Sequence, residues 1–266
     1  MSKATPLGTA FEQHGDPARP TVVLIHGLGL SRRLFDPMID SFAADFHVLT
    51  YDLYGHGESA PPPRTADLSL FAEQIRELLD VTGVEKAALV GFSIGGMINR
   101  RFALDFPERL SALAIWSSPH DRGVEGQQAV EDRAATVRDQ GTMSTLPAAL
   151  ERWFTPEFRA AAPGKVDRVR QWRELVDAEG YAQAAWVLAH GVRELIRPAT
   201  PITARALVMT AENDSGSNPA MSHAITAELP FAEPTLIIPR LQHLGLMEDP
   251  EAFAAPTLTF LKRTLL

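Results

Sequence analysis

The stretch Gly91-Phe92-Ser93-Ile94-Gly95-Gly96 decides the fold, because it leads a buried apolar run directly into a helix. The run Ala87–Val90 precedes it, and apolar residues at helical spacing follow it (Ile94, Met97, Ile98 and Phe102). The stretch fits the pattern G-x-S-x-G, in which a serine occupies a strand-to-helix turn too tight for bulky neighbours. Gly91 and Gly95 leave that room, and Gly96 allows the helix to approach the sheet. We therefore predict that Ser93 is a nucleophile held in a strained backbone conformation.

Short apolar runs bounded by turn residues recur on both sides of this turn. They are Thr21–His26, Phe46–Tyr51, Lys86–Gly91, Ser111–Trp116, Arg205–Thr210 and Pro234–Ile238. Each run is nearly all apolar, which is typical of a strand buried on both faces of a parallel sheet. Stretches with helical spacing lie between the first runs, and a closing helix is expected around Pro250–Leu261. This alternation predicts an α/β fold with a doubly wound, mostly parallel sheet.

The segment 121–197 has a different character. It contains no strand-like run, and its helix-like pieces are rich in Arg, Glu and Ala. It carries 12 acidic and 11 basic residues, so the net charge of −8 belongs almost entirely to the rest of the chain. We predict a helical cap over residues 121–197 and a core formed by residues 1–120 and 198–266. The alternative interpretation is a set of ordinary surface helices.

The composition excludes several classes of protein. The 266 residues include no Cys, which excludes thiol nucleophiles, Cys-ligated zinc, iron–sulfur clusters and disulfides; we expect no metal and no cofactor. With 25 basic against 33 acidic residues, the chain lacks the basic footprint of a nucleic-acid or membrane-surface protein. The first ten residues lack a signal-peptide core, and the longest apolar run, Ala184–Ala189, is too short to span a bilayer. The sequence predicts a cytoplasmic protein and leaves open whether it forms a homo-oligomer.

The stretch His26-Gly27-Leu28-Gly29 ends the first apolar run. A loop in this position can offer a backbone N–H group to an oxygen that becomes negatively charged during acyl transfer. We predict an oxyanion hole formed by the N–H groups of Leu28 and of Ile94, the residue after the nucleophile. An ordinary glycine turn is the alternative.

A serine needs a base to become a nucleophile, and the base needs a third group to orient it. Of the eight histidines, His243 lies in the loop after the last apolar run, at the sheet edge where doubly wound folds place their sites. Asp214 follows the penultimate run and is the predicted orienting acid, with Asp121 as its rival. The predicted catalytic residues therefore occur in the order Ser93, Asp214, His243.

With this order and these motifs, the chain resembles the α/β-hydrolase fold superfamily over its whole length. Asp52-Leu-Tyr-Gly-His-Gly-Glu-Ser59 is similar to a loop that is structural in that family, so no chemistry is assigned to Asp52 or His56. Through Arg152-Trp-Phe-Thr155 and Glu179-Gly-Tyr181, the cap resembles that of 3-oxoadipate enol-lactonases and related carboxylesterases. The chain departs from those lactonases at Gln242, where they usually have a small residue.

The resemblance and the residues together imply hydrolysis of a small carboxylic ester or lactone, a small-molecule substrate, through an acyl-enzyme on Ser93. A carbon–carbon bond hydrolase or a cofactor-free haloperoxidase or perhydrolase would use the same three residues. A non-catalytic receptor for a small ligand is the alternative outside the enzymes. Trp153 is predicted to line the substrate pocket by resemblance, and Trp116 by its position at a strand end. Arg152 is the first candidate to bind a substrate carboxylate.

Overall fold

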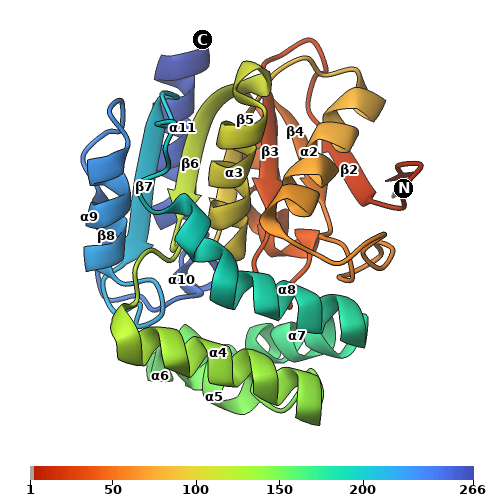
Figure 1. Ribbon diagram of the computed structural model, residues 1–266. Coiled ribbons are helices and arrows are strands. Elements are labelled where there is room, and N and C mark those ends of the chain that lie inside the picture. Colours follow the sequence, from red (N-terminus) through yellow and green to blue (C-terminus); the bar gives the residue numbers. More distant parts are fainter. Residues whose placement is uncertain (1–2) are drawn as a thin grey trace.

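One eight-stranded sheet organises the molecule. The computed structural model describes residues 3–266, and its strands follow the order β1-β2-β4-β3-β5-β6-β7-β8 (Figure 1). The strands are β1 (Lys3–Ala4), β2 (Ala10–His14), β3 (Thr21–Ile25), β4 (His47–Tyr51), β5 (Ala87–Phe92), β6 (Leu110–Trp116), β7 (Ala206–Ala211) and β8 (Leu236–Ile238). The neighbours from β4 to β8 pair in parallel, which confirms the predicted fold class.

The two strands at the N-terminal edge were not predicted. β1 pairs with β2, and β2 with β4, in antiparallel orientation. β2 has the sequence AFEQH, and only its first two residues are buried. An edge strand with a polar, half-exposed end lacks the continuous apolar run by which the central strands are recognised.

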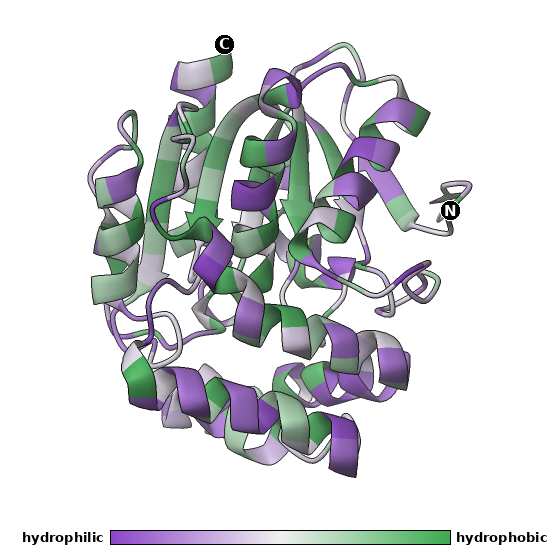
Figure 2. Cartoon of the chain, viewed as in Figure 1, coloured by the Kyte–Doolittle hydropathy of each residue, from purple (hydrophilic) through white to green (hydrophobic). Residues whose placement is uncertain are grey.

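Each central strand is buried on both faces. Leu89 packs into one hydrophobic core and its neighbour Val90 into the other, since side chains alternate along a strand. The helices of the sheet layers are α1 (Ile39–Ala43), α2 (Leu68–Thr82), α3 (Ile94–Asp105), α9 (Pro219–Glu228), α10 (Gly245–Glu248) and α11 (Pro250–Leu265), with the 3₁₀ segments η1 (Arg32–Met38) and η2 (Pro107–Arg109). Figure 2 shows the central strands coloured as hydrophobic, whereas the helices carry hydrophilic residues as well.

Within the described residues, the long connection between β6 and β7 contains helices and the loops that join them, and no strand. It holds α4 (Gly123–Gln140), α5 (Leu146–Trp153), α6 (Pro156–Ala161), α7 (Pro163–Glu174), α8 (Ala178–His190) and the 3₁₀ segment η3 (Gly191–Leu195). Helices α4 to α8 lie together beyond the carboxyl ends of the parallel strands (Figure 1). Val192 and Leu195 of η3 instead belong to the same hydrophobic core as Leu89, so the end of the predicted cap packs against that face of the sheet.

The turn at Ser93 requires glycine on both sides. Ser93 has φ 57° and ψ −116°, a conformation that L-residues rarely adopt. A Cβ atom on Gly91 would lie 2.2 Å from the carbonyl oxygen of Gly95, and one on Gly95 would lie 2.4 Å from that of Ile25. Backbone atoms of packed elements cannot move away, so only glycine fits at these two positions.

The loop from Asp52 to Ser59 has a structural role. The Asp52 carboxylate accepts hydrogen bonds from the backbone N–H of Arg32 at 2.7 Å and of Glu58 at 3.0 Å, and pairs with the Arg32 guanidinium. His26 Nε2 accepts a hydrogen bond from Leu53 N–H at 3.0 Å. Burial lowers the pKa of His26 to about 4 and that of His56 to about 3, so both rings are neutral in the folded protein at neutral pH.

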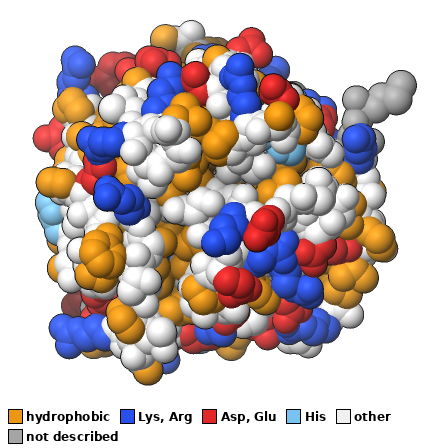
Figure 3. Space-filling view, turned by 90° about the horizontal axis from the view of Figure 1, so that it is seen from above, with side chains coloured by type: hydrophobic (Ala, Val, Ile, Leu, Met, Phe, Trp, Pro, Cys, Tyr) orange, Lys and Arg blue, Asp and Glu red, His pale blue; other side chains and the backbone are white. Residues whose placement is uncertain are grey.

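Within residues 3–266, no helix combines the length and the apolar character needed to cross a bilayer. On the side opposite α4 to α8, basic and acidic side chains are intermixed (Figure 3).

We predict that Gly95→Val destabilises the protein as well as impairing its activity. The added side chain would overlap the backbone of β3, and overpacking of this kind costs about 3 kcal/mol. Thermal unfolding checks this, with Gly164→Val as the control, since a Cβ atom on Gly164 meets nothing within 4 Å. A soluble Gly95→Val protein with the wild-type Tm would contradict the tight turn.

The two buried histidines predict a loss of stability in mild acid. The unfolded chain binds protons at His26 and His56 near pH 6.5, whereas the folded protein binds them only near the lowered pKa values of about 4 and about 3. The free energy of unfolding should therefore fall as the pH falls from about 6.5 to 4, by up to roughly 1.4 kcal/mol per pH unit for each ring. Urea unfolding at several pH values measures this slope. His56→Asn should reduce the slope; a slope equal to that of the wild type would refute this explanation.

Candidate active site

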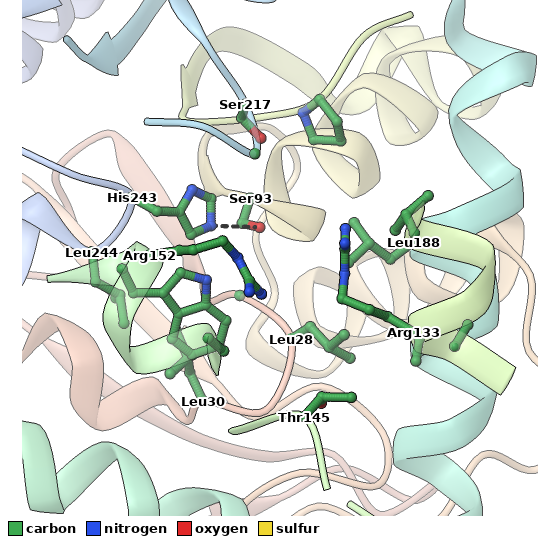
Figure 4. Close-up of a pocket in the computed structure, with 18 of the residues that line it drawn as sticks. Leu28, Leu30, Ser93, Arg133, Thr145, Arg152, Leu188, Ser217, His243 and Leu244 are labelled. Carbon is green, nitrogen blue, oxygen red and sulfur yellow. Dashed lines mark hydrogen bonds between the residues drawn. The ribbon is translucent and has the colours of Figure 1, made fainter. Parts of the chain in front are cut away.

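Ser93, His243 and Asp214 form one hydrogen-bonded chain. They lie after β5, β8 and β7 respectively, at the carboxyl edge of the sheet. His243 Nε2 is 3.2 Å from Ser93 Oγ (Figure 4). His243 Nδ1 is 2.7 Å from Asp214 Oδ2. All three residues are at most 8% exposed. The ring of His243 can therefore take a proton from Ser93 while its other nitrogen donates to a carboxylate.

The surroundings of Asp214 keep its carboxylate ionised and fixed. The second oxygen, Oδ1, accepts hydrogen bonds from the backbone N–H groups of Gly216 and Ser217, each at 2.9 Å. Burial alone would raise the pKa of Asp214, but the charge and hydrogen bond of His243 and the two backbone donors outweigh burial and lower it. A fixed negative charge orients the imidazole and stabilises it when it becomes protonated.

Asp121, the rival acid, lies elsewhere. Its side chain is exposed and accepts a hydrogen bond from the backbone N–H of Gly123 at 2.9 Å, next to the start of α4. The carboxylate that contacts His243 is that of Asp214. The structure therefore places the predicted acid, and not the rival Asp121, next to the histidine.

The two predicted oxyanion donors flank Ser93. Ile94 is the first residue of α3, where a backbone N–H has no partner within the helix. Leu28 belongs to the loop after β3 and lines the cavity above Ser93. Neither N–H donates a hydrogen bond to any group within residues 3–266. Both are therefore free to bind an oxygen of a ligand.

A cavity of about 130 Å³, here called the Ser93 pocket, lies between the sheet edge and the helices beyond it. Its lining comes from the core loops and from four of these helices: Gly27, Leu28, Leu30, Phe92, Ser93, Pro119, Arg122, Val130, Arg133, Ala134, Val137, Thr145, Ala149, Arg152, Trp153, Arg173, Tyr181, Ala185, Leu188, Ser215, Gly216, Ser217, His243 and Leu244. An apolar cavity of roughly 150 Å³ holds one benzene molecule, so the pocket suits a small ligand. Within the described residues, no three His, Asp or Glu side chains gather to hold a metal ion.

The two predicted pocket tryptophans have different positions. Trp153 lines the Ser93 pocket, with its ring centroid 6.1 Å from that of His243. The prediction for Trp116 is wrong: its ring is fully buried between Phe35 and Phe253, and its Nε1–H donates to Thr257 Oγ1 at 3.1 Å. Trp116 lies at the correct end of β6, but its side chain belongs to the hydrophobic core that contains Val90.

The motif Arg152-Trp-Phe-Thr155 is bonded directly to the histidine loop. The backbone N–H of Leu244 donates to the carbonyl oxygen of Trp153 at 2.9 Å. The Glu248 carboxylate accepts from both Thr155 N–H, at 2.9 Å, and Thr155 Oγ1, at 2.6 Å. Glu248 thus bonds to the motif, whereas its neighbour Asp249 caps the closing helix α11 by accepting a hydrogen bond from Ala252 N–H. These bonds, which the sequence did not reveal, fix the pocket wall at Trp153 relative to His243.

Three pocket arginines were also missed. The sequence singled out Arg152, but Arg122, Arg133 and Arg173 line the Ser93 pocket as well. A signal for Arg133 existed in the helical period of α4, because it lies on the same face as the pocket residues Val130, Ala134 and Val137. An arginine within an apolar helical face is a candidate ligand-binding residue once that face is known to border a cavity.

Comparisons with known proteins agree with this architecture. The family described as the alpha/beta hydrolase fold matches residues 20–155. Over 255 residues, the chain is 28% identical to 3-oxoadipate enol-lactonase 2 of Acinetobacter baylyi, covering 95% of this chain and 92% of that protein. It is also 28% identical over 243 residues to (E)-2-((N-methylformamido)methylene)succinate hydrolase of the same bacterium, covering 91% and 89%. The crystal structure of the enol-lactonase from Burkholderia xenovorans LB400 superposes with a TM-score of 0.88 at 22% identity, covering 98% of this chain and 100% of the other. The chain belongs to the α/β-hydrolase fold family.

Proposed function

We propose that this protein is a serine hydrolase that cleaves a small carboxylic ester or lactone. The observation that carries the proposal is the hydrogen-bonded chain from Asp214 through His243 to Ser93, which ends at the floor of the Ser93 pocket. This chain supplies a nucleophile, a base and an orienting acid, and the reaction needs no further cofactor.

In the first half of the proposed reaction, Ser93 Oγ attacks the carbonyl carbon of the substrate while His243 Nε2 takes its proton. The negative charge that develops on the carbonyl oxygen is stabilised by the N–H groups of Leu28 and Ile94. The carbon–oxygen bond to the leaving alcohol then breaks, and His243 returns the proton to that alcohol. In a lactone the alcohol remains part of the acyl group bound to Ser93.

In the second half, His243 takes a proton from a water molecule, and the resulting hydroxide attacks the acyl-enzyme. The ester bond to Ser93 breaks, the proton passes to Ser93 Oγ, and a carboxylic acid leaves. The ionised Asp214 stabilises the protonated imidazole in both halves.

The relatives support hydrolysis as the reaction. The name of the first specifies an enol-lactonase and that of the second a hydrolase, and both matches span the core and the helices beyond the sheet edge. The proposal that a lactone is a substrate rests on the name of the first relative and on the small size of the Ser93 pocket.

The triad variants and a covalent probe test the proposal together. Ser93→Ala should lower kcat by about 10⁶ because the three residues act as a unit. Asp214→Asn should lower kcat by about 10⁴ through the wrong tautomer of His243, whereas Asp121→Asn should behave as wild type. A fluorophosphonate probe should label Ser93 in the wild-type protein. Absence of labelling would favour a non-catalytic receptor, and loss of activity in Asp121→Asn alone would refute the acid assignment.

Trp153→Ala should change substrate choice more than chemistry. The indole forms a wall of the Ser93 pocket, and an apolar wall discriminates by about 1–3 kcal/mol per methylene group. We expect wild-type activity on p-nitrophenyl acetate and butyrate that falls for long acyl chains, and a Trp153→Ala protein with altered KM and chain-length preference. Trp186→Ala is the matched control, since that indole is 52% exposed and lies outside the pocket. An unchanged ester profile in Trp153→Ala, or best activity on long-chain triglycerides, would contradict the small pocket.

A further inference from the structure

Positive charge is concentrated in the Ser93 pocket although the protein as a whole carries a net charge of −8. Of the 11 basic residues in segment 121–197, four arginines line the pocket, and none of the 12 acidic residues of that segment does. The surface on the opposite side of the molecule, by contrast, mixes both signs (Figure 3). A concave site with charge of one sign concentrates ligands of the opposite sign.

Two of the four arginines are already occupied by neutral partners. Arg122 donates to Gln127 Oε1 and to the carbonyl oxygen of Leu188. Arg173 is buried, donates to the carbonyl oxygen of Thr142 and stacks on the Tyr181 ring at 4.3 Å. These two guanidinium groups keep the walls positive but are held in place by the protein.

Arg133 and Arg152 are free. Neither guanidinium makes a hydrogen bond or an ion pair with any group within residues 3–266. Two other arginines of the helices beyond the sheet edge do have acidic partners: Arg138 of α4 pairs with Glu179, and Arg170 of α7 pairs with Asp167. Arg133 comes from α4 and Arg152 from α5, and Figure 4 shows the two side chains reaching into the cavity from opposite sides. Ser93 lines the same cavity.

The surroundings of the two free arginines disfavour their positive charge. Burial and the charge of Arg152 lower the pKa of Arg133, while Asp132 opposes this effect. Burial lowers the pKa of Arg152, opposed by Glu151. Both side chains are still open to solvent through the cavity, so each guanidinium stays charged and accessible. An anion between them would relieve the repulsion and supply the missing hydrogen-bond acceptors.

We propose that Arg133 and Arg152 together bind a carboxylate group of the substrate, so that the ester or lactone cleaved at Ser93 is itself an anion. The planar guanidinium matches a carboxylate with two parallel N–H···O bonds, which gives orientation as well as attraction. This proposal adds the charge of the substrate to the proposed function, and it rests on that function for the bond that is cleaved. Hydrolysis of such a lactone, or of an ester with its carboxylate on the acyl part, yields a dicarboxylate.

A binding experiment tests the two arginines without any catalysis. Ser93→Ala protein is titrated with glutarate and with adipate, as dicarboxylate probes, and with the neutral glutaramide, by calorimetry. We expect a dicarboxylate to bind and glutaramide not to bind. Adding Arg133→Gln or Arg152→Gln should weaken binding of the dicarboxylate about tenfold, the loss of one charge-assisted contact. Adding Arg170→Gln removes the same charge from the outer surface and should leave binding intact. No dicarboxylate binding, or equal weakening by all three substitutions, would overturn the proposal.

A kinetic experiment then addresses the substrate class. Hydrolysis of methyl hydrogen glutarate, an anion, is compared with that of dimethyl glutarate, its neutral counterpart. The wild type should prefer the half-ester in kcat/KM, and the ratio of the two values should fall about tenfold in Arg133→Gln and Arg152→Gln, mainly through KM. Arg133→Lys and Arg152→Lys should give intermediate ratios because charge is kept and the paired donors are lost. Preference for the neutral diester in the wild type would overturn the anionic substrate.

The two experiments keep the proposals separable. Fluorophosphonate labelling and cleavage of dimethyl glutarate report on Ser93 alone, whereas dicarboxylate binding to the Ser93→Ala protein reports on the arginines alone. Binding of glutarate through Arg133 and Arg152 without cleavage of either ester would support the anion site and refute the proposed hydrolase activity.

Discussion

The backbone conformation of Ser93 is the constraint on which the rest of the molecule depends. It brings β3, β5 and α3 so close that carbonyl oxygens occupy the space of the missing side chains at Gly91 and Gly95. A hydrogen bond from Ser93 N–H to the carbonyl oxygen of Trp116, at 2.9 Å, continues the pairing with β6 up to this residue. Contacts with three strands and a helix therefore hold Ser93 in its strained conformation. This conformation directs Oγ away from the sheet edge toward His243.

The other groups of the site are fixed by loops that leave the same edge. Asp214 is held by two backbone donors from its own loop, so its position does not depend on the helices beyond the sheet. His243 is different, because the residue after it is hydrogen-bonded to Trp153 and its loop ends at the pair Glu248–Thr155. The core therefore supplies the nucleophile and the acid, while the base is shared between the core and α5.

The sequence was sufficient where local chemistry decides the structure. The turn at Ser93 and the apolar central strands followed from glycine geometry and from burial on two faces, and chain order led to Asp214 and His243. The sequence was insufficient where a side chain's direction depends on packing. Trp116 lies at the expected strand end but points into the core. To predict the position of Arg133, one would have to know which face of α4 borders the pocket. The Glu248–Thr155 pair could not be predicted because it joins residues 93 positions apart.

The bonds between Thr155 and Glu248 also bear on how proteins of this architecture can be recombined. A helical segment transplanted from a relative with its boundaries drawn at β6 and β7 would separate Thr155 from its partner, which lies after β8. The chimera would then contain an intact nucleophile and acid but a histidine loop without its anchor. Grafts should therefore carry residues 243–248 along with the helices, although the two pieces are distant in the gene.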